Sequence, residues 1–350
     1  MRKIALGLLL SSFLLSAQAF VSDDERYLYL RPLLGQLDIE LFGAVYLIDK
    51  KEVTDPEILD VLAEVLAKNI DKADSKLFAQ FDAIQRMMRS LGKSGLGRYR
   101  PFLIGLENRI VSERSKSHLR IALQQLPQAS DAVFEPGKLD LNVARAAVER
   151  LYLKGRKPAS DDFTIPSEST IADVFSKFGY PHAITVGVGW KQVYGIDLIY
   201  FNRGAIRMRN TRPGLNTYVV MRELPHPPID DGQPSAILAH RLMIDGTRLF
   251  LGGAEYVSTL PAPDRTILDA AADRVWLSLD ASDDDSSHAV RFLCLTFKKA
   301  NDPRYRPVLV DVVERSKLHS RTKGVCGEIV KHFGDRKADE YLRREITATK

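Results

Sequence analysis

Cysteine is scarce in this sequence and charge is nearly balanced, and both features exclude whole classes of protein. Only two of the 350 residues are cysteine, Cys294 and Cys326, which excludes a disulfide-dense scaffold and a zinc site with four cysteine ligands. The two cysteines either form one disulfide or are small buried hydrophobic residues. The 50 basic and 45 acidic residues leave a formal charge of +5. This excess is too small to predict a nucleic-acid partner.

Long apolar runs are absent beyond the first twenty residues, and the run within them is short. Two cations precede an apolar stretch over 4–15, and Ala17 and Ala19 offer the small side chains that signal peptidase accepts. A membrane-spanning helix needs about 20 apolar residues. We therefore expect a cleaved signal peptide at 1–19, a periplasmic location in a bacterium, and a mature chain without a transmembrane segment.

Catalytic and metal-binding signatures are also lacking. The seven histidines form no HExxH motif, the serines form no GxSxG or SxxK motif, and the acidic run 283–285 lacks the rest of a calcium loop. The glycines of 187–189 and 252–253 are interpreted as tight turns at strand ends. We predict no metal, no cofactor and no local catalytic motif. A hydrolase whose two carboxylates meet only in the fold is the alternative.

An internal duplication is the most informative feature that the sequence does contain. Residues 83–101 align without gaps with 289–307, and 58–66 align with 267–275. Both copies share the motif RYRP, which comprises Arg98, Tyr99, Arg100 and Pro101 in the first copy and Arg304, Tyr305, Arg306 and Pro307 in the second. We interpret the motif as a packing device, with tyrosine between helices and arginines along the edge. A binding site for an anionic partner is the alternative.

Both copies have the apolar spacing of helices. Thr54 is expected to cap the first of them, followed by Pro56 in the first turn. Gly95 in one copy and Asn301 in the other mark the sharp turn before the third helix. The predicted helices lie near 58–66, 76–91, 99–113 and 140–154 in the first part of the chain, and near 267–279, 286–299 and 304–316 in the second.

The pattern changes to strand-like alternation between the two copies. A polar, proline-containing linker spans 155–162, and a capping box that begins at Thr170 predicts one short helix. Strands are expected at 196–201, 205–208 and 218–221, followed by a loop over 224–234. A further hairpin is expected at 241–244 and 247–251, around an Asp-Gly turn.

Four arginines gather in this middle part of the chain. Arg207 and Arg209 alternate with apolar residues on a predicted strand, and Arg203 and Arg212 lie at the adjoining turns. Strand alternation places Arg207 and Arg209 on one face, which would be cationic. In the cell envelope this face could bind an anionic lipid surface or an acidic protein. An ordinary exposed sheet face with nearby acids is the alternative.

The stretch TIADVFSKFGYPHAI, followed by LIYFNRGAIRMR, resembles the small lipoprotein of the β-barrel assembly machinery, over about 164–209. The resemblance implies a helix before a short antiparallel sheet, although the lipid-attached cysteine of that family is missing. The flanking helices resemble HEAT-like repeats.

The predicted fold class is α+β, with duplicated helical-repeat, solenoid-like units separated by a small antiparallel module. The predicted domains are 20–155, 163–258 and 262–350, after the signal peptide. The pattern favours an exported, non-catalytic binding or scaffold protein with a protein partner in the envelope. The alternative is a periplasmic hydrolase of cell-wall or carbohydrate material.

Overall fold

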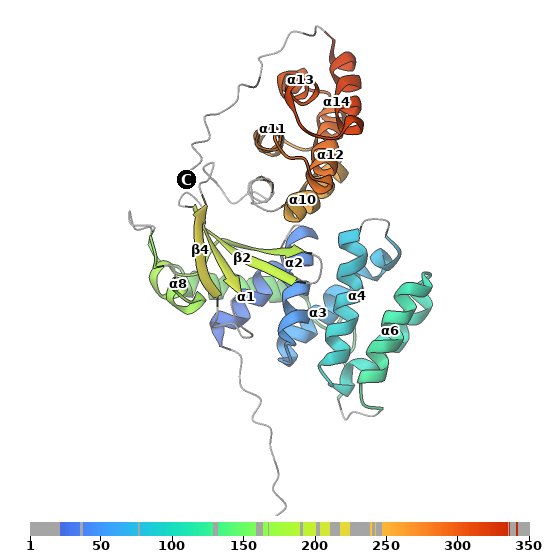
Figure 1. The fold of residues 1–350 in the computed structure, drawn as a ribbon. Helices are drawn as coiled ribbons and strands as arrows, with labels where there is room; N and C mark the ends of the chain where they lie inside the picture. Colours follow the sequence, from blue (N-terminus) through green and yellow to red (C-terminus); the bar gives the residue numbers. More distant parts are fainter. Residues whose placement is uncertain are drawn as a thin grey trace, which may run out of the picture.

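The protein is an α+β fold in which helices predominate, as predicted (Figure 1). The computed structural model describes residues 22–35, 38–75, 78–128, 132–158, 164–166, 168–189, 192–200, 204–210, 218–224, 239, 242, 247–334, 336 and 341. The predicted signal peptide, residues 225–234 of the predicted loop and residues 159–162 of the predicted linker therefore lie outside the described residues. Within the described part, no helix is both long and apolar enough to cross a membrane.

The elements that the structure describes in the first part of the chain are all helices. Its helices are α1 (Asp23–Leu33), α2 (Asp38–Lys51), α3 (Pro56–Asn69), α4 (Phe78–Lys93), α5 (Arg100–Leu106), α6 (Glu113–Gln125) and α7 (Leu141–Gly155). The expected cap at Thr54 is wrong, because the carboxylate of Asp55 accepts the N–H groups of Glu57 and Ile58 at 2.9 and 3.1 Å. The single helix predicted over 99–113 is instead α5, a 3₁₀ turn and the start of α6.

The middle of the chain forms a short helix and a sheet. Helix α8 (Ile171–Phe178) begins at the predicted capping box of Thr170 and Asp173, and it ends at Gly179, whose φ of 77° an L side chain rarely adopts. The strands β1 (Ala183–Gly189), β2 (Gln192–Tyr200), β3 (Gly204–Asn210) and β4 (Tyr218–Leu224) form an antiparallel sheet in sequential order. The predicted strands correspond to β2, β3 and β4, whereas the sequence analysis missed β1.

The last part of the chain is helical again. Its helices are α10 (Thr247–Thr259), α11 (Arg265–Leu277), α12 (Asp284–Ala300), α13 (Arg306–Arg315) and α14 (Ser320–Phe333). The predicted hairpin at 241–251 is wrong, because Leu242 is helical and Thr247 begins α10. The glycines at 252–253 consequently lie inside a helix rather than at a strand end. Ala254 and Val257 are fully buried at helical spacing, which explains why this segment is a helix.

Two hydrophobic cores lie on opposite faces of the sheet. Ile184 and Val186 of β1 belong to the core of the first helices, whereas Ala183 and Ile199 belong to the core of the last helices. Strand alternation produces this division. Figure 1 shows α10–α14 on one side of the sheet and α1–α6 on the other. The sheet is thus a shared layer between two helical units.

The duplication extends one helix further than the sequence alignment indicated. Helix α2 packs on α4 and on β1, and α10 likewise packs on α12 and on β1. The segments 43–46 and 253–256 read Gly-Ala-Val-Tyr and Gly-Ala-Glu-Tyr. We therefore define the first unit as α2–α6 and the second unit as α10–α14. The predicted boundary at 262 separates α10 from the helix on which it packs.

The turn before the third helix has the same backbone geometry in both units. Gly95 has a φ of 66° and Asn301 has a φ of 53°, and they occupy equivalent positions in the alignment. Glycine has no Cβ penalty in this left-handed region, and asparagine is one of the few other residues that tolerate it. The sequence prediction that two different residues make one chain reversal is confirmed here.

Candidate functional site

The RYRP motif of the first unit holds a buried tyrosine against an acid. The Tyr99 side chain is fully buried, and its hydroxyl donates to Asp60 Oδ1 at 2.8 Å. Arg98 Nη2 donates to the other oxygen of the same carboxylate at 3.2 Å. Arg100 donates to the carbonyl oxygens of Leu123 and Leu126, at the end of α6. Three residues of the motif thus connect α3, α5 and α6.

The second unit repeats this arrangement. Tyr305 is fully buried and donates to Asp269 Oδ1 at 2.7 Å, while Arg304 Nη2 lies 3.6 Å from the same oxygen. Burial, followed by the neighbouring carboxylate, raises the pKa of both motif tyrosines far above the ordinary value. The hydroxyl groups therefore remain protonated donors. Pro101 and Pro307 lie in the first turns of α5 and α13, where a missing N–H costs little.

A second aromatic residue closes each motif, and the sequence analysis missed it. The N–H groups of Phe134 and Tyr341 donate to the carbonyl oxygens of Arg98 and Arg304 at 2.9 and 3.0 Å. The ring centroids of Tyr99 and Phe134 lie 5.8 Å apart, and those of Tyr305 and Tyr341 lie 5.7 Å apart, both with an interplanar angle of 49°.

The only sequence signal for this aromatic residue was its spacing. Phe134 follows its motif tyrosine by 35 residues and Tyr341 follows its own by 36. These contacts are those of a packing motif. Both tyrosines are fully buried, whereas the side chains of Asp60 and Asp269 are 23 % and 16 % exposed.

The predicted arginine face is only partly within the described residues. Arg203 and Arg212 lie outside them, and Arg209 lies in β3 with its side chain undescribed. Arg207 donates from Nε and Nη2 to the two oxygens of Asp197 at 2.7 and 3.2 Å, and only 13 % of its side chain is exposed. Arg207 is therefore engaged with the neighbouring strand. The anionic-partner role of these four arginines stays a prediction.

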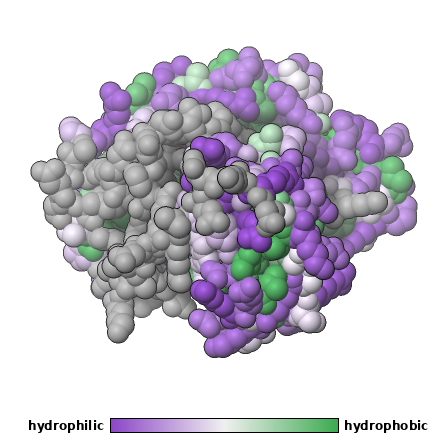
Figure 2. Space-filling model, turned by 90° about the horizontal axis from the view of Figure 1, so that it is seen from above, coloured by the Kyte–Doolittle hydropathy of each residue, from purple (hydrophilic) through white to green (hydrophobic). Residues whose placement is uncertain are grey.

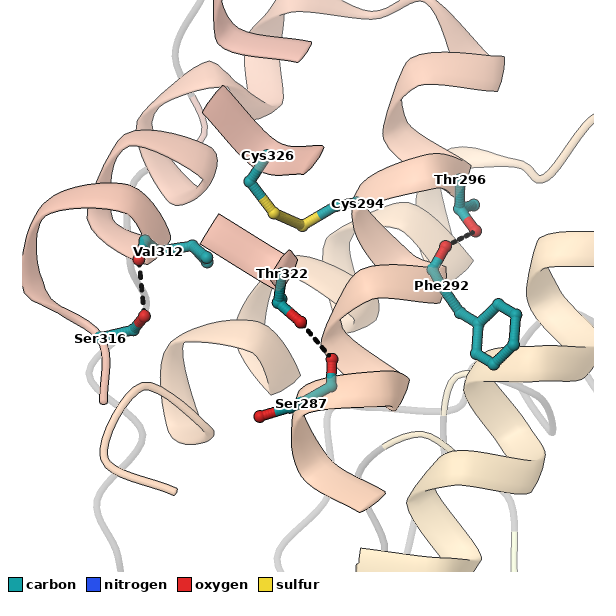
Figure 3. Close-up of a disulfide and its surroundings, with 8 residues drawn as sticks. All are labelled: Ser287, Phe292, Cys294, Thr296, Val312, Ser316, Thr322 and Cys326. Carbon is teal, nitrogen blue, oxygen red and sulfur yellow. Dashed lines mark hydrogen bonds between the residues drawn. A yellow bond between two sulfur atoms is a disulfide. The ribbon is translucent and has the colours of Figure 1, made fainter. Parts of the chain in front are cut away.

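The two cysteines are bridged. Cys294 of α12 and Cys326 of α14 form a disulfide with a Cα–Cα distance of 5.8 Å, and both residues are fully buried (Figure 3). The second unit has one residue more between its motif and its last helix, because α5 and α13 begin 206 residues apart whereas α6 and α14 begin 207 apart. The positions equivalent to the cysteines are therefore Met88 of α4 and Leu119 of α6, which are also fully buried. The disulfide thus replaces an apolar pair. Nearby, Thr322 of α14 donates to the carbonyl oxygen of Ser287 of α12 at 2.9 Å.

A charged cluster joins α2 and α4 in the first unit, and sequence reasoning did not find it. Asp49 is almost fully buried, and Arg86, Arg89 and Lys93 lie within 2.7–3.3 Å of its carboxylate. The guanidinium of Arg86 also lies 3.7 Å from the centroid of the Tyr46 ring. Asp82 pairs with Arg86 and Glu52 pairs with Lys93, so the three cations of this cluster are balanced by three carboxylates.

The aligned positions of the second unit carry different chemistry. Arg86 corresponds to Phe292, and Arg89 corresponds to Leu295, 42 % of which is exposed. In Figure 3 the ring of Phe292 points away from the disulfide. The two units therefore match at the buried motif and differ on this face.

The described residues contain no group of three or more histidine, cysteine, aspartate or glutamate side chains that could hold a metal ion. Comparison of the chain with protein-family models, with curated proteins and with solved structures gives no match.

Proposed function

We propose that the protein is an exported, non-catalytic binding or scaffold protein of the bacterial cell envelope, and that its partner is another protein. The observation that carries the proposal is the contrast between the two units. Their interiors repeat the same tyrosine–acid pair, as with Tyr99 and Tyr305, whereas the aligned outer positions differ in charge and polarity. The tyrosine–acid pair is the same in both units because both need it to pack their helices. Different outer faces on one framework are what a protein with two contact surfaces needs.

The expected location supports an extracytoplasmic partner. The sequence of 1–19 has the pattern of a signal peptide, and the Cys294–Cys326 disulfide is of a kind that persists in oxidising compartments. Among the residues that Figure 2 colours by hydropathy, hydrophilic ones predominate on this face, and apolar ones lie in small groups between them.

The deeply buried carboxylates support a structural rather than a catalytic use of acids. Asp49 contacts three cations and Asp197 binds Arg207. Glu64 accepts the N–H of Gly137 at 2.8 Å, and Asp273 accepts the hydroxyl of Tyr341 at 3.0 Å. Each of these acids is bound by a group of this chain. A hydrolase would instead need two carboxylates that converge on a substrate.

Site-specific photo-crosslinking in the native host tests this proposal. A photoreactive residue is placed at position 295 on α12 or at position 89 on α4, with position 143 on α7 as the exposed control, because Val143 is 62 % exposed. We expect the first two positions, and not the control, to cross-link reproducibly to envelope proteins. Cross-linking no stronger than the control, together with release of soluble products from cell-wall material by the purified protein, would establish the hydrolase instead.

A further inference from the structure

Helix α6 of the first unit carries three exposed or half-exposed side chains on one stripe. Arg114, His118 and Ile121 are separated by four and three residues, which places them on the same face of the helix. The exposed fraction of Ile121 is 45 %, so an apolar side chain is accessible beside these charges. The stripe runs along roughly 10 Å of helix, at about 1.5 Å per residue.

Close packing of α4 against α6 brings Arg89 to this stripe. A Cβ atom built on Gly92 of α4 would lie only 2.7 Å from the Cα of Ala122 on α6, so the two backbones nearly touch there. Arg89 lies one turn before Gly92, and His118 lies one turn before Ala122. The helix crossing therefore places an arginine of α4 next to the histidine of α6.

The stripe carries the cation Arg114, which is unpaired within the described part of the chain. Arg89, by contrast, is paired with Asp49, and the charge of Asp82 acts on His118 in the direction that raises its pKa. Among the described residues, no carboxylate forms an ion pair with Arg114, whose guanidinium lies 4.8 Å from the centroid of the Phe81 ring, or with His118. Partial burial, followed by the charges of Arg89 and Arg114, lowers the pKa of His118 below the ordinary value. The histidine thus lies in the field of both guanidinium groups.

Arg89 retains one guanidinium nitrogen that can still donate hydrogen bonds to a ligand. Its Nε and Nη2 atoms donate to Asp49 at 3.0 and 2.7 Å, and 32 % of its side chain is exposed. Its Nη1 atom has no partner among the described residues. A guanidinium that is fixed from one side in this way loses little further conformational freedom when it binds an anion.

The second unit shows that packing does not require this stripe. The positions equivalent to 89, 118 and 121 are Leu295, Val325 and Glu328, and only the equivalent of Arg114 is conserved in charge, as Arg321. Both units nevertheless form the same helices. Arg89, His118 and Ile121 are therefore particular to the surface of the first unit.

We propose that the α4–α6 stripe, formed by Arg89, Arg114 and Ile121, is the docking surface for an acidic peptide segment of the partner protein. This inference rests on the proposed function and names the chemistry of its partner. Carboxylates of the segment bind the two guanidinium groups, and an apolar side chain packs on Ile121. The combination of cations with exposed apolar atoms favours a peptide over an inorganic anion, which would use only the charges.

Fluorescence anisotropy with the full mature chain tests the docking surface. The probe is a fluorescein-labelled peptide with the repeat Glu-Glu-Leu, and the comparison probes are the Lys-Lys-Leu peptide, a leucine-free polyglutamate peptide of equal charge, and vesicles with anionic lipid. We expect saturable binding of the Glu-Glu-Leu peptide that weakens as ionic strength rises. Equal binding of polyglutamate, or stronger binding of the vesicles, would overturn the peptide assignment.

Matched variants locate the binding on the molecule. Arg114→Glu and Ile121→Ser change exposed positions on α6, and each is expected to weaken peptide binding about tenfold, which corresponds to about 1.4 kcal/mol. Arg321→Glu, at the equivalent position of the second unit, is the control and should change binding less than about twofold. Equal losses for Arg114→Glu and Arg321→Glu would show that only net charge matters. Cross-links from position 295 with no peptide binding would refute the docking surface and leave the binding function standing.

Discussion

Replacing Tyr305 by phenylalanine should lower the free energy of unfolding of the second unit. The substitution keeps the buried ring and its stacking, and it removes only the 2.7 Å hydrogen bond to Asp269. Hydrogen bonds to charged groups contribute roughly 1.5–3 kcal/mol, and the carboxylate that loses its donor is only 16 % exposed. We therefore expect the free energy of unfolding of this unit to fall by about 2 kcal/mol.

Hydrogen exchange measured by mass spectrometry resolves this loss by unit. Because 1.4 kcal/mol is a factor of ten, exchange of core amides in α11 and α13 should accelerate about 30-fold, with little change in α3 and α5. Tyr99→Phe should accelerate hydrogen exchange in the first unit only. Tyr152→Phe is the control, since its hydroxyl has no hydrogen-bond partner among the described residues. A loss below about 0.5 kcal/mol in both motif variants, or no difference between them and the control, would refute the role assigned to the tyrosine–acid pair.

Three further perturbations have definite expected outcomes. Cys294→Ala with Cys326→Ala opens a bridge between residues 32 apart in sequence, and should lower the denaturant midpoint by the equivalent of about 2–4 kcal/mol; an unchanged midpoint under oxidising conditions would contradict this. Gly92→Ala should lower the free energy of unfolding by about 1–3 kcal/mol, measured by thermal denaturation, because its Cβ meets the backbone of α6. Gly105→Ala is the control, because a Cβ there meets nothing within 4 Å, and it should be neutral or stabilising. The pKa of His118 is lowered in the folded state, so protonation at low pH favours unfolding. The wild type should therefore lose more stability than His118→Gln as the pH falls from about 7.5 to about 5. A difference in melting temperature between the two proteins that stays constant over this pH range would argue against the shift.

Local signals explain what the sequence predicted well. The capping box at Thr170, the alternation of β2 and β3, and the turn residues Gly95 and Asn301 each act over a few neighbouring residues. Their physical chemistry is therefore visible in a single sequence. The gapless alignment of the two copies added long-range information, because it showed that two segments with few identical residues form the same helices.

Through-space contacts explain what the sequence did not predict. Asp49 meets Arg89 across 40 residues of sequence, and Phe134 enters the first core from a segment with no helical or strand periodicity. Residues 247–251, which begin α10, were predicted as a strand because a short apolar run fits a strand and a buried helix equally well. Packing of Ala254 and Val257 against α12 decides between them, and only the fold shows it.

The ion pair between Asp197 and Arg207 has a consequence for how the sheet finds its pairing during folding. The two residues are direct partners across β2 and β3, on the face that also carries Ile199 and faces the second core. If β3 slid by one residue, every side chain would exchange faces, and Arg207 would enter the apolar layer that holds Ile184. A buried charge that loses its partner costs about 3–5 kcal/mol. The pair therefore favours the observed register of β2 and β3 over registers shifted by one residue. Because both faces of the sheet are covered by apolar cores, hydrophobic burial alone would discriminate less between these registers.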